Sequence, residues 1–529
     1  MPRNRPSVPH SRPTARRWGR APLASVPNHQ PAGATEYRLS KSRVCEGLQC
    51  HKFLWWRMHE PEAPELVIDD PAARFRMDQG TEVGELARRQ AGPVELIHFP
   101  RDQIEAKLAA TAEAMRRGAQ RIFEAAFRAN GIFVAVDVLE RDGPRYTVIE
   151  VKSTTKVKPE HIGDIAVQVH VLRQCGVNVT RAEVMHLNPD YTVPTSPNLP
   201  NLPQLFVRED VTPSVEIYLL DLSVELAHQF AMLQGPRPEV PIGPHCFEPR
   251  DCPFMDRCWG DAPEHHVSSL YRIRSDTAWA LASDGHETIL ELPTELKLSV
   301  VARRQVEAVG TQTMIVEPGL NAALAGLKGP IAYLDFETVG PAVPVWSGCH
   351  PYTAVPVQFS VHTERADGGY SHCEWLAEGP TDPRPVIARA LIEACRGAGS
   401  VLMYSSFERV RIRRLAEDVP ELADELLELD GRLVDLEPIV RNHVYHPGFG
   451  GSFSLKEVLP ALIAELSYDD LEVNDGQVAS VLLNRMLLRN DPADAGERAA
   501  LRANLLAYCK LDTWAMVKLV ERLRELASA

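Results

Sequence analysis

Apolar and polar residues alternate in two short runs of the first half of the chain, which predicts a pair of β-strands at 131–139 and 146–151. Longer stretches with the helical spacing of apolar residues flank this pair, at 102–128 and 159–175. A further strand is expected at 181–187. An order of helix, hairpin, helix and strand predicts an α/β fold.

A second α/β pattern begins at about Gly329. It contains three strands that turn residues connect as hairpins, then a helix, then another strand. The expected ranges are 331–337, 355–363, 371–376, 385–397 and 401–405. This order resembles that of a ribonuclease-H-like fold.

These patterns divide the chain into four segments. Residues 1–34 contain six Arg, seven Pro and no acidic residue, so a disordered basic tail is expected at 1–35. One α/β domain is expected at 36–262 and another at 329–529. Residues 263–328 are expected to form a small, mostly helical connector.

Composition excludes several classes of protein. The 529 residues carry a formal net charge of −14, which excludes a polycation that coats nucleic acid indiscriminately. No segment approaches the roughly 20 apolar residues that a membrane span needs, and we expect a cytoplasmic protein without a membrane partner. Ten Cys are too few for a disulfide scaffold of this length, so grouped Cys indicate a metal site or catalysis.

The first α/β domain carries charged residues at the ends of its predicted strands. Glu150 and Lys152 share one strand face, and Asp137 lies on the preceding strand. Two carboxylates on adjacent strands can bind Mg²⁺ or Mn²⁺, while a lysine orients or deprotonates the attacking water. That combination is typical of phosphodiester hydrolysis.

The flanking predicted helices supply further polar candidates. Asp164 and Gln168 lie four residues apart and therefore share a helix face. Glu124, expected in the preceding helix, is a candidate third metal ligand. The alternative interpretation is that these charges form a solvated strand edge without a site.

Four cysteines form a separate group of candidates. Cys246, Cys252 and Cys258 follow a C-x5-C-x5-C pattern, and Cys50 lies in an aromatic-rich helix expected from Tyr37 to Glu60. Four thiolates can bind an iron–sulfur cluster or a zinc ion. The alternative is that these are buried apolar cysteines.

Together these motifs resemble a known family. The run Leu39-Ser-Lys-Ser-Arg43, the run Cys50-His-Lys-Phe-Leu-Trp-Trp56, Asp137, Glu150-Val-Lys152, Gln168 and the terminal Cys triplet resemble PD-(D/E)XK nucleases of the RecB/AddB type. The closest resemblance is to the iron–sulfur branch that includes AddB and the CRISPR adaptation exonucleases. It implies a restriction-endonuclease-like core, with a [4Fe–4S] cluster on the four cysteines.

The same resemblance implies roles for individual residues. Asp137 and Glu150 would bind metal, Lys152 would be the catalytic lysine, and Gln168 would hold the helical Gln position behind it. The chain contains no G-x-x-x-x-G-K-[ST] motif. A nucleoside triphosphate motor is therefore not expected within it.

The second α/β domain carries its own acidic residues. Asp335 and Glu337 share one face of a predicted strand, and Tyr508 and Asp512 lie four residues apart in a strong helical pattern. Strand and helix carboxylates together can hold two cations a few Å apart for in-line attack on a phosphodiester. Tyr508 is placed to position the nucleophilic water.

These D-x-E and Y-x3-D motifs resemble the first and third motifs of DEDDy-type 3′→5′ exonucleases. At the second motif the sequence reads Tyr404-Ser-Ser-Phe-Glu408, so that Glu replaces the usual Asp, and Asp435 is a competing or auxiliary acid. Residues 329–529 also resemble a bacterial family of unknown function often found behind such a nuclease domain.

We therefore expect a nuclease that depends on Mg²⁺ or Mn²⁺ and hydrolyses phosphodiester bonds. The resemblance favours DNA over RNA as the partner, with single-stranded ends as substrate and a role in repair, recombination or defence. Two alternatives stay open. One is a nucleic-acid-binding scaffold with degenerate sites, and the other is an RNA-processing exonuclease that uses only the C-terminal domain.

Overall fold

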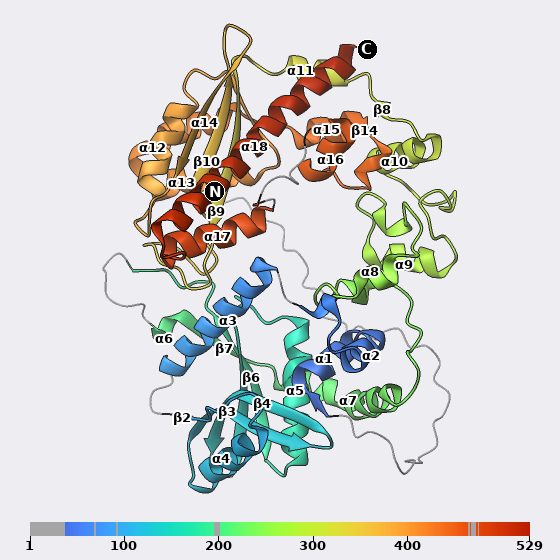
Figure 1. Ribbon diagram of the computed structural model, residues 1–529, viewed down its shortest axis with the longest axis vertical. Helices are drawn as coiled ribbons and strands as arrows, with labels where there is room; N and C mark the ends of the chain where they lie inside the picture. The colour runs from blue at the N-terminus through green and yellow to red at the C-terminus, as the bar shows by residue number, and fades with distance from the viewer. Residues whose placement is uncertain are drawn as a thin grey trace, which may run out of the picture. The chain divides into compact units, whose positions relative to one another are not determined.

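The computed structural model describes residues 38–528 with the exception of 68–69, 91–93, 195–201, 464–465, 467–471 and 474 (Figure 1). The protein is a mixed α/β protein, as expected. The tail expected at 1–35 lies outside the described residues. Within the part of the chain that is described, no helix is both long enough and apolar enough to cross a membrane.

The N-terminal half contains a seven-stranded sheet. Its neighbours follow the order β2-β3-β4-β5-β6-β7, and β1 pairs with β4. The strands are β1 Leu39–Ser40, β2 Glu95–Leu96, β3 Arg121–Ala129, β4 Ile132–Asp142, β5 Arg145–Lys152, β6 Val179–Leu187 and β7 Phe206–Asp210. β3, β4 and β5 are antiparallel neighbours, whereas β5 and β6 run parallel. The three strands expected from alternation, β4, β5 and β6, are confirmed.

One of the helices of this half connects the parallel strands β5 and β6. The helices are α1 Lys41–Gln49, α2 His51–His59, α3 Pro71–Gln90, α4 Ile104–Arg116, α5 Pro159–Gln174, α6 Leu202–Leu205, α7 Thr212–Leu233 and α8 Met255–Trp259. α5 is the helix expected at 159–175, and it packs on β3, β4, β5 and β6. Its apolar residues Ile165, Val169 and Leu172 are buried, which fixes the helix on one face of the sheet.

Two of the predicted helices are wrong in extent. The helix expected at 102–128 ends at Arg116, because Gly118 adopts a left-handed conformation with φ +81° that terminates the helix, and β3 follows. The helix expected from Tyr37 to Glu60 is interrupted at Cys50. There an extended residue, with φ −160° and ψ 124°, separates α1 from α2.

The C-terminal half contains a five-stranded sheet in the order β11-β10-β9-β12-β13. The strands are β9 Ile331–Val339, β10 Val355–Glu364, β11 Tyr370–Leu376, β12 Ser400–Met403 and β13 Leu433–Asp435. β9, β10 and β11 are antiparallel neighbours, while β12 runs parallel to both β9 and β13. All four strands expected at 331–405 are therefore present.

Helices cover both faces of this sheet (Figure 1). They are α12 Arg384–Ala394, α13 Phe407–Asp418, α14 Ala423–Arg432, α15 Glu437–His443, α16 Leu455–Leu462, α17 Gly476–Leu488 and α18 Ala495–Ser528. Ala332, Leu334 and Phe336 of β9 pack in one apolar cluster with residues of α12, α13 and α14. The alternate residues of β9 face α18, which contacts β9 and β10.

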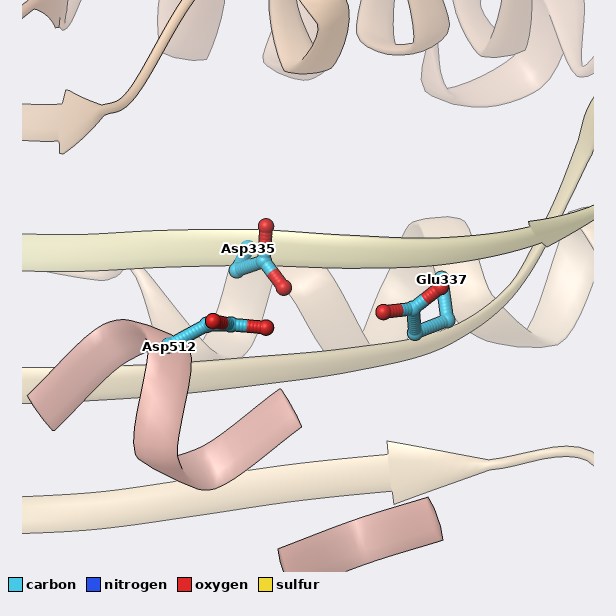
Figure 2. A group of neighbouring side chains, drawn as sticks. All are labelled: Asp335, Glu337 and Asp512. Atoms are coloured by element: carbon cyan, nitrogen blue, oxygen red, sulfur yellow. The ribbon is translucent and has the colours of Figure 1, made fainter. Parts of the chain in front are cut away.

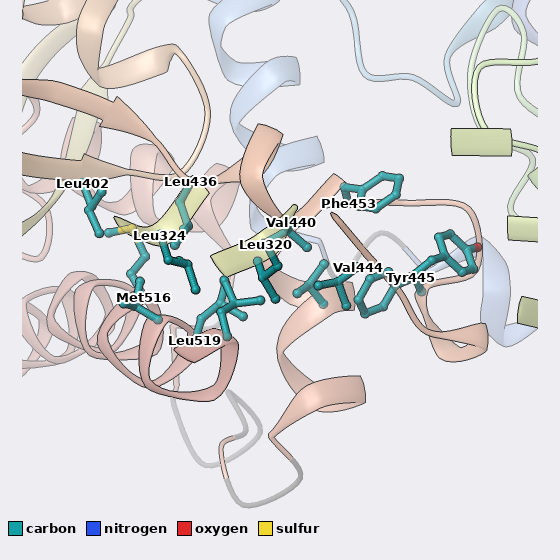
Figure 3. Close-up of a cluster of buried hydrophobic side chains, with 14 of the residues drawn as sticks. Leu320, Leu324, Leu402, Leu436, Val440, Val444, Tyr445, Phe453, Met516 and Leu519 are labelled. Atoms are coloured by element: carbon teal, nitrogen blue, oxygen red, sulfur yellow. The ribbon is translucent and has the colours of Figure 1, made fainter. Parts of the chain in front are cut away.

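The connector contributes to the apolar core of the C-terminal half. Its elements are α9 Ser275–Ser283, α10 Val300–Thr311, β8 Ile315–Val316 and α11 Leu320–Ala325, and β8 pairs with β14, Val444–Tyr445. Leu320 and Leu324 of α11 lie in one cluster with Met516 and Leu519 of α18 (Figure 3). Since complete burial of such a side chain contributes about 1.5–3 kcal/mol, this cluster holds residues 270–324 firmly against the C-terminal sheet.

Candidate functional site

Three acidic side chains expected to bind metal converge on the C-terminal sheet. Asp335 and Glu337 extend from β9, and Asp512 extends toward them from α18 (Figure 2). Their carboxylate oxygens all lie within 4.8 Å of one another. Among the described residues, this is the one group of three or more His, Cys, Asp or Glu with ligand atoms that close.

The position of α18 over this face follows from polar residues on β10. Gln358 pairs with Glu337 and Ser360 pairs with Asp335 across the β9–β10 ladder, so each pair shares a face of the sheet. The buried Gln358 donates from Nε2 to the Leu505 carbonyl of α18 at 2.8 Å, and the hydroxyls of Ser360 and Thr513 are 2.8 Å apart. These bonds fix α18 so that Asp512, beside Thr513, meets the β9 carboxylates.

Glu408 joins the same region from α13. Its side chain is buried, and its Oε2 has no hydrogen-bond partner within the described structure. A buried carboxylate oxygen without a donor is costly unless it accepts a proton or binds a cation. Glu408 thus lines the same cavity from a separate element, and its charge contributes to the raised pKa of Asp335, but it is not part of the group within 4.8 Å.

Asp435, the competing acid, has a different role. Its Oδ1 accepts from the backbone N–H of Ser405 at 3.0 Å and from that of Glu437 at 3.1 Å. Ser405 has φ +93°, a conformation that a serine rarely adopts. Asp435 thus stabilises the turn that leads into α13 and positions Glu408, and it is not part of the group within 4.8 Å.

The cluster binds protons strongly when no cation offsets its charge. Burial and the Asp512 and Glu337 carboxylates raise the pKa of Asp335 well above its ordinary value. Burial and the Asp512 charge likewise raise the pKa of Glu337. Burial, with Asp435 and Asp512 nearby, raises the pKa of Glu408 to about 8. A divalent cation bound here would displace these protons, because it stabilises the ionised carboxylates.

A cavity of about 790 Å³ opens onto this cluster. Its walls include Tyr508 and Phe453, which are buried, together with the half-buried or exposed aromatic residues Tyr271, Tyr404 and Phe407. The space is large enough for a nucleotide-sized group. Hard oxygen ligands at one wall and aromatic surfaces elsewhere suit a phosphodiester that carries a base.

A second polar cluster lies on β4, β5 and α5. Glu150 is buried, its Oε1 accepts from Lys152 Nζ at 2.9 Å, and its Oε2 accepts from Gln168 Nε2 at 2.6 Å. Asp137 Oδ2 accepts from the Val151 backbone N–H at 2.7 Å. The structure thus brings together four of the five residues expected at this centre.

Two further residues join this cluster: Lys41, to which the sequence analysis gave no role, and Asp164, which it gave as a polar candidate beside Gln168. Lys41 Nζ lies 2.6 Å from Glu150 Oε1, and Asp164 accepts a hydrogen bond from Lys152. Lys41 begins α1 directly after β1, which pairs with β4 and so holds the lysine at the sheet. For Lys41 the sequence signal was its place in the Leu39–Arg43 run, and for Asp164 it was the four-residue spacing to Gln168. Neither signal identified the contact that the residue makes.

The two lysines determine the charge of this cluster. Burial opposes ionisation of Glu150, but Lys41 and Lys152 overcome it and hold its pKa well below the ordinary value. Burial and the Glu150 charge raise the pKa of Asp137 to about 7. The Glu150 carboxylate is therefore ionised without any metal, whereas Asp137 titrates near neutrality.

Glu124 lies apart from this cluster. The sequence analysis placed it in a helix, but it lies on β3 with a left-handed backbone at φ +57°. Its side chain is exposed, and no hydrogen bond or ion pair joins it to another described residue. The expectation of a ligand from a helix preceding the hairpin is wrong, because Gly118 ends that helix before residue 124.

The four cysteines line one small pocket with Phe53, Trp56 and Phe254. Cys50 lies at the start of α2, and Cys246, Cys252 and Cys258 lie around α8. Burial raises the pKa of Cys50, whereas N–H groups of Phe53 and Lys52 that donate to its sulfur oppose the shift. Burial also raises the pKa of Cys252 to about 12. Without a metal the thiols of Cys50 and Cys252 therefore stay protonated at neutral pH.

The spacing of the sulfur atoms distinguishes two kinds of metal group. Zn–S bonds of about 2.3 Å in a tetrahedral site place the sulfurs about 3.8 Å apart. No three of these four sulfurs lie within 4.8 Å of one another. A cluster of several irons spans a larger distance between its thiolates.

Similarity to known proteins is limited to part of the chain. Residues 332–454 match a family described as "Domain of unknown function (DUF2779)". A stretch of 211 residues is 26% identical to "Uncharacterized protein MG366 homolog" of Mycoplasma pneumoniae, and it covers 36% of this chain and 32% of that protein. The chain thus spans about a third of that relative. The segment that carries Asp335, Glu337 and Glu408 is similar to a family whose description gives no activity.

Proposed function

We propose that the protein is a metal-dependent nuclease with two catalytic centres. The observation that carries the proposal is the convergence of Asp335, Glu337 and Asp512 within 4.8 Å at the wall of a cavity. DNA is the proposed partner in preference to RNA, with single-stranded ends as substrate. Repair, recombination or defence in the cytoplasm is the proposed setting.

The C-terminal half supports a ribonuclease-H-like exonuclease. Its sheet order, with a three-stranded antiparallel meander extended by two parallel strands, is consistent with that fold. Asp335, Glu337, Asp512 and Glu408 would hold Mg²⁺ or Mn²⁺. When bound, the metal would supply positive charge at the scissile phosphate and polarise the attacking water. Tyr508, at the cavity wall, would orient that water.

The N-terminal half supports a restriction-endonuclease-like nuclease centre. Asp137 and Glu150 would hold the divalent metal, and Gln168 keeps Glu150 in place through its 2.6 Å hydrogen bond. Lys152, 2.9 Å from Glu150, would stabilise negative charge at the phosphate and orient the water. The hard oxygen ligands of this cluster are those that Mg²⁺ prefers.

The cysteines support a [4Fe–4S] cluster that links two distant parts of the N-terminal half. Cys50 lies near the start of the described chain, and the other three ligands follow α7. Cross-linking of residues 50 and 246–258 would restrict the unfolded chain and so stabilise the fold. Zinc is the alternative that metal analysis would reveal.

The test is metal-dependent degradation of 5′- and 3′-labelled single-stranded DNA by wild type, Lys152→Ala and Asp335→Ala, with labelled RNA in competition. We expect each variant to lose a different activity. Arg274→Ala, an exposed residue paired with Asp276, is the control and should cleave like wild type. Binding without cleavage under Mg²⁺ and Mn²⁺ would instead favour a scaffold, and loss only in Asp335→Ala with RNA as substrate would favour RNA processing.

A further inference from the structure

One arginine of the connector lines the cavity at the C-terminal centre. Arg272 lies between the short 3₁₀ turn Val267–Ser269 and α9, outside the elements that carry the acidic residues. The charged side chains that line the cavity are Arg272, Asp335, Glu337, Glu408, Glu437, Lys456 and Asp512. Five carboxylates therefore face only two cations. These carboxylates would repel a polyanionic substrate, so each positively charged side chain of the cavity would contribute to binding it.

The two cations of the cavity differ in their partners. Lys456 Nζ forms an ion pair with Asp475 at 2.9 Å, and Glu437 pairs with Arg441 at 2.9 Å. Arg272 makes no ion pair within 4 Å of any described carboxylate, although its charge lowers the pKa of the nearby Glu437, and its side chain is exposed. Its guanidinium carbon lies 5.3 Å from the centre of the Tyr271 ring. The aromatic ring orients the guanidinium and leaves its N–H donors available to an anion.

The backbone at Arg272 is held in a conformation that an arginine rarely adopts. Its φ is +55°, in the left-handed region. The preceding residue is fixed on both sides, since Tyr271 N–H donates to Gln305 Oε1 at 2.7 Å and its ring contacts Phe453 edge-on at 5.3 Å. A strain of about 1 kcal/mol or more persists only where the surroundings enforce it, and such positions concentrate at functional sites.

We propose that Arg272 is a substrate-binding residue whose guanidinium binds a backbone phosphate of the nucleic-acid strand that enters this cavity. The inference rests on the proposed nuclease function of the C-terminal centre and adds a residue that the DEDDy-type motifs do not contain. The cation bound by the acidic cluster would neutralise only the phosphate that is cleaved. Arg272 would bind a neighbouring phosphate and so hold the strand in register with that centre.

The test compares Arg272→Ala, Arg272→Lys and Arg274→Ala in the Lys152→Ala background, in which the N-terminal centre is silent. Arg274 lies two residues away, is exposed and pairs with Asp276, and it does not line the cavity. The first readout is hydrolysis of labelled oligothymidylate with Mg²⁺ at several salt concentrations. The second is fluorescence anisotropy of the same strand with Ca²⁺, which reports binding without cleavage.

We expect Arg272→Ala to raise KM about tenfold and leave kcat within about twofold, since one charged hydrogen bond to phosphate is lost. The slope of log affinity against log salt should fall by about one in magnitude. Arg272→Lys should retain the slope, because it keeps the charge, and Arg274→Ala should match its parent. A fall in kcat without a change in KM, or equal effects of both Ala variants, would overturn the proposal.

The anisotropy separates this inference from the proposed activity. If the parent protein binds the strand but does not cleave it, the nuclease proposal fails, and the difference between Arg272→Ala and Arg274→Ala in binding still decides the role of Arg272. If the strand does not bind at all, the role of Arg272 is rejected as well.

Discussion

The substitution Glu408→Gln should stabilise the metal-free protein at neutral and alkaline pH. Glu408 is buried, and its pKa is raised from the ordinary 4.5 to about 8 by burial and the neighbouring Asp435 and Asp512 charges. Each pKa unit corresponds to about 1.4 kcal/mol, so this shift limits the gain to about 5 kcal/mol. We expect about half of that, because coupled carboxylates share their protons.

The sign of the pH dependence follows from proton binding. Between pH 4.5 and about 8 the folded protein holds a proton on Glu408 that the unfolded chain has lost, so wild-type stability falls as pH rises through this window. Gln carries no such proton. The stability difference between variant and wild type should therefore be near zero below pH 4.5 and grow until about pH 8.

Calorimetric unfolding in EDTA across this pH range measures the difference. A gain of about 2 kcal/mol corresponds to a Tm increase of roughly 4–8 °C if the C-terminal half unfolds as one unit of about 200 residues. Glu417→Gln is the matched control, because Glu417 lies on the same helix and is exposed, with its partner Arg414 at 3.2 Å. Its effect should stay within about 0.5 kcal/mol.

Added Mn²⁺ should make the wild-type protein more stable than the Glu408→Gln variant. At about 100 times its Kd, a bound ion stabilises the folded state by about 2.7 kcal/mol, and the variant would lack one of the proposed ligands. A Glu408→Gln protein that is less stable than wild type at pH 8 without metal would refute the reasoning. A gain that does not change with pH would also refute it, since the argument depends on the titration of Glu408.

Three further substitutions test the other sites. Lys41→Met should lower the free energy of unfolding by about 3 kcal/mol in urea titrations, because it removes one partner of the buried Glu150, whereas the exposed Lys158→Met should change it little. Cys252→Ser should reduce bound iron and sulfide and the broad absorption near roughly 400 nm; unchanged iron, or one equivalent of zinc in wild type, would contradict the cluster. Tyr508→Phe should lower kcat by about tenfold or more on single-stranded DNA with KM nearly unchanged, and an unchanged kcat would exclude the tyrosine from orienting the water.

The local part of each site could be predicted from sequence because it depends on strand parity. In Asp335-Phe-Glu337 the apolar residue faces α12–α14 and the acids face the opposite side of the sheet. Glu150 and Lys152 follow the same rule on β5. The distance between Asp335 and Asp512 could not be predicted in this way, since it depends on the anchoring of α18 by Gln358 and Ser360. The Gln-x-Ser alternation on β10 was a visible signal of that anchoring.

The errors in the predicted helix 102–128 and in the role of Glu124 arose because a single residue, Gly118, changes the secondary structure. Gly118 ends α4, and the apolar residues that follow can occupy a strand as well as a helix, so periodicity alone did not separate the two. Glu124 was assigned a site role on that wrong assumption. Lys41 and Arg272 were missed for another reason: Lys41 is the first residue of α1 and Arg272 lies between two elements, and at neither position does a repeating pattern give the side chain a direction.

The two carboxylate clusters balance their charge in different ways, and this difference bears on how each would bind metal. Lys41 and Lys152 compensate Glu150, so that its pKa is held low and the ligand is ionised before a cation arrives. The carboxylates around Asp335 take up protons instead, because burial and their mutual repulsion outweigh the Lys456 charge, which lowers the pKa of Glu337. A metal that binds at that cluster would have to displace protons, so its binding would strengthen with rising pH. The N-terminal cluster has mainly the Asp137 proton, with a pKa of about 7, to lose, so the two centres would depend on pH to different degrees even with the same metal.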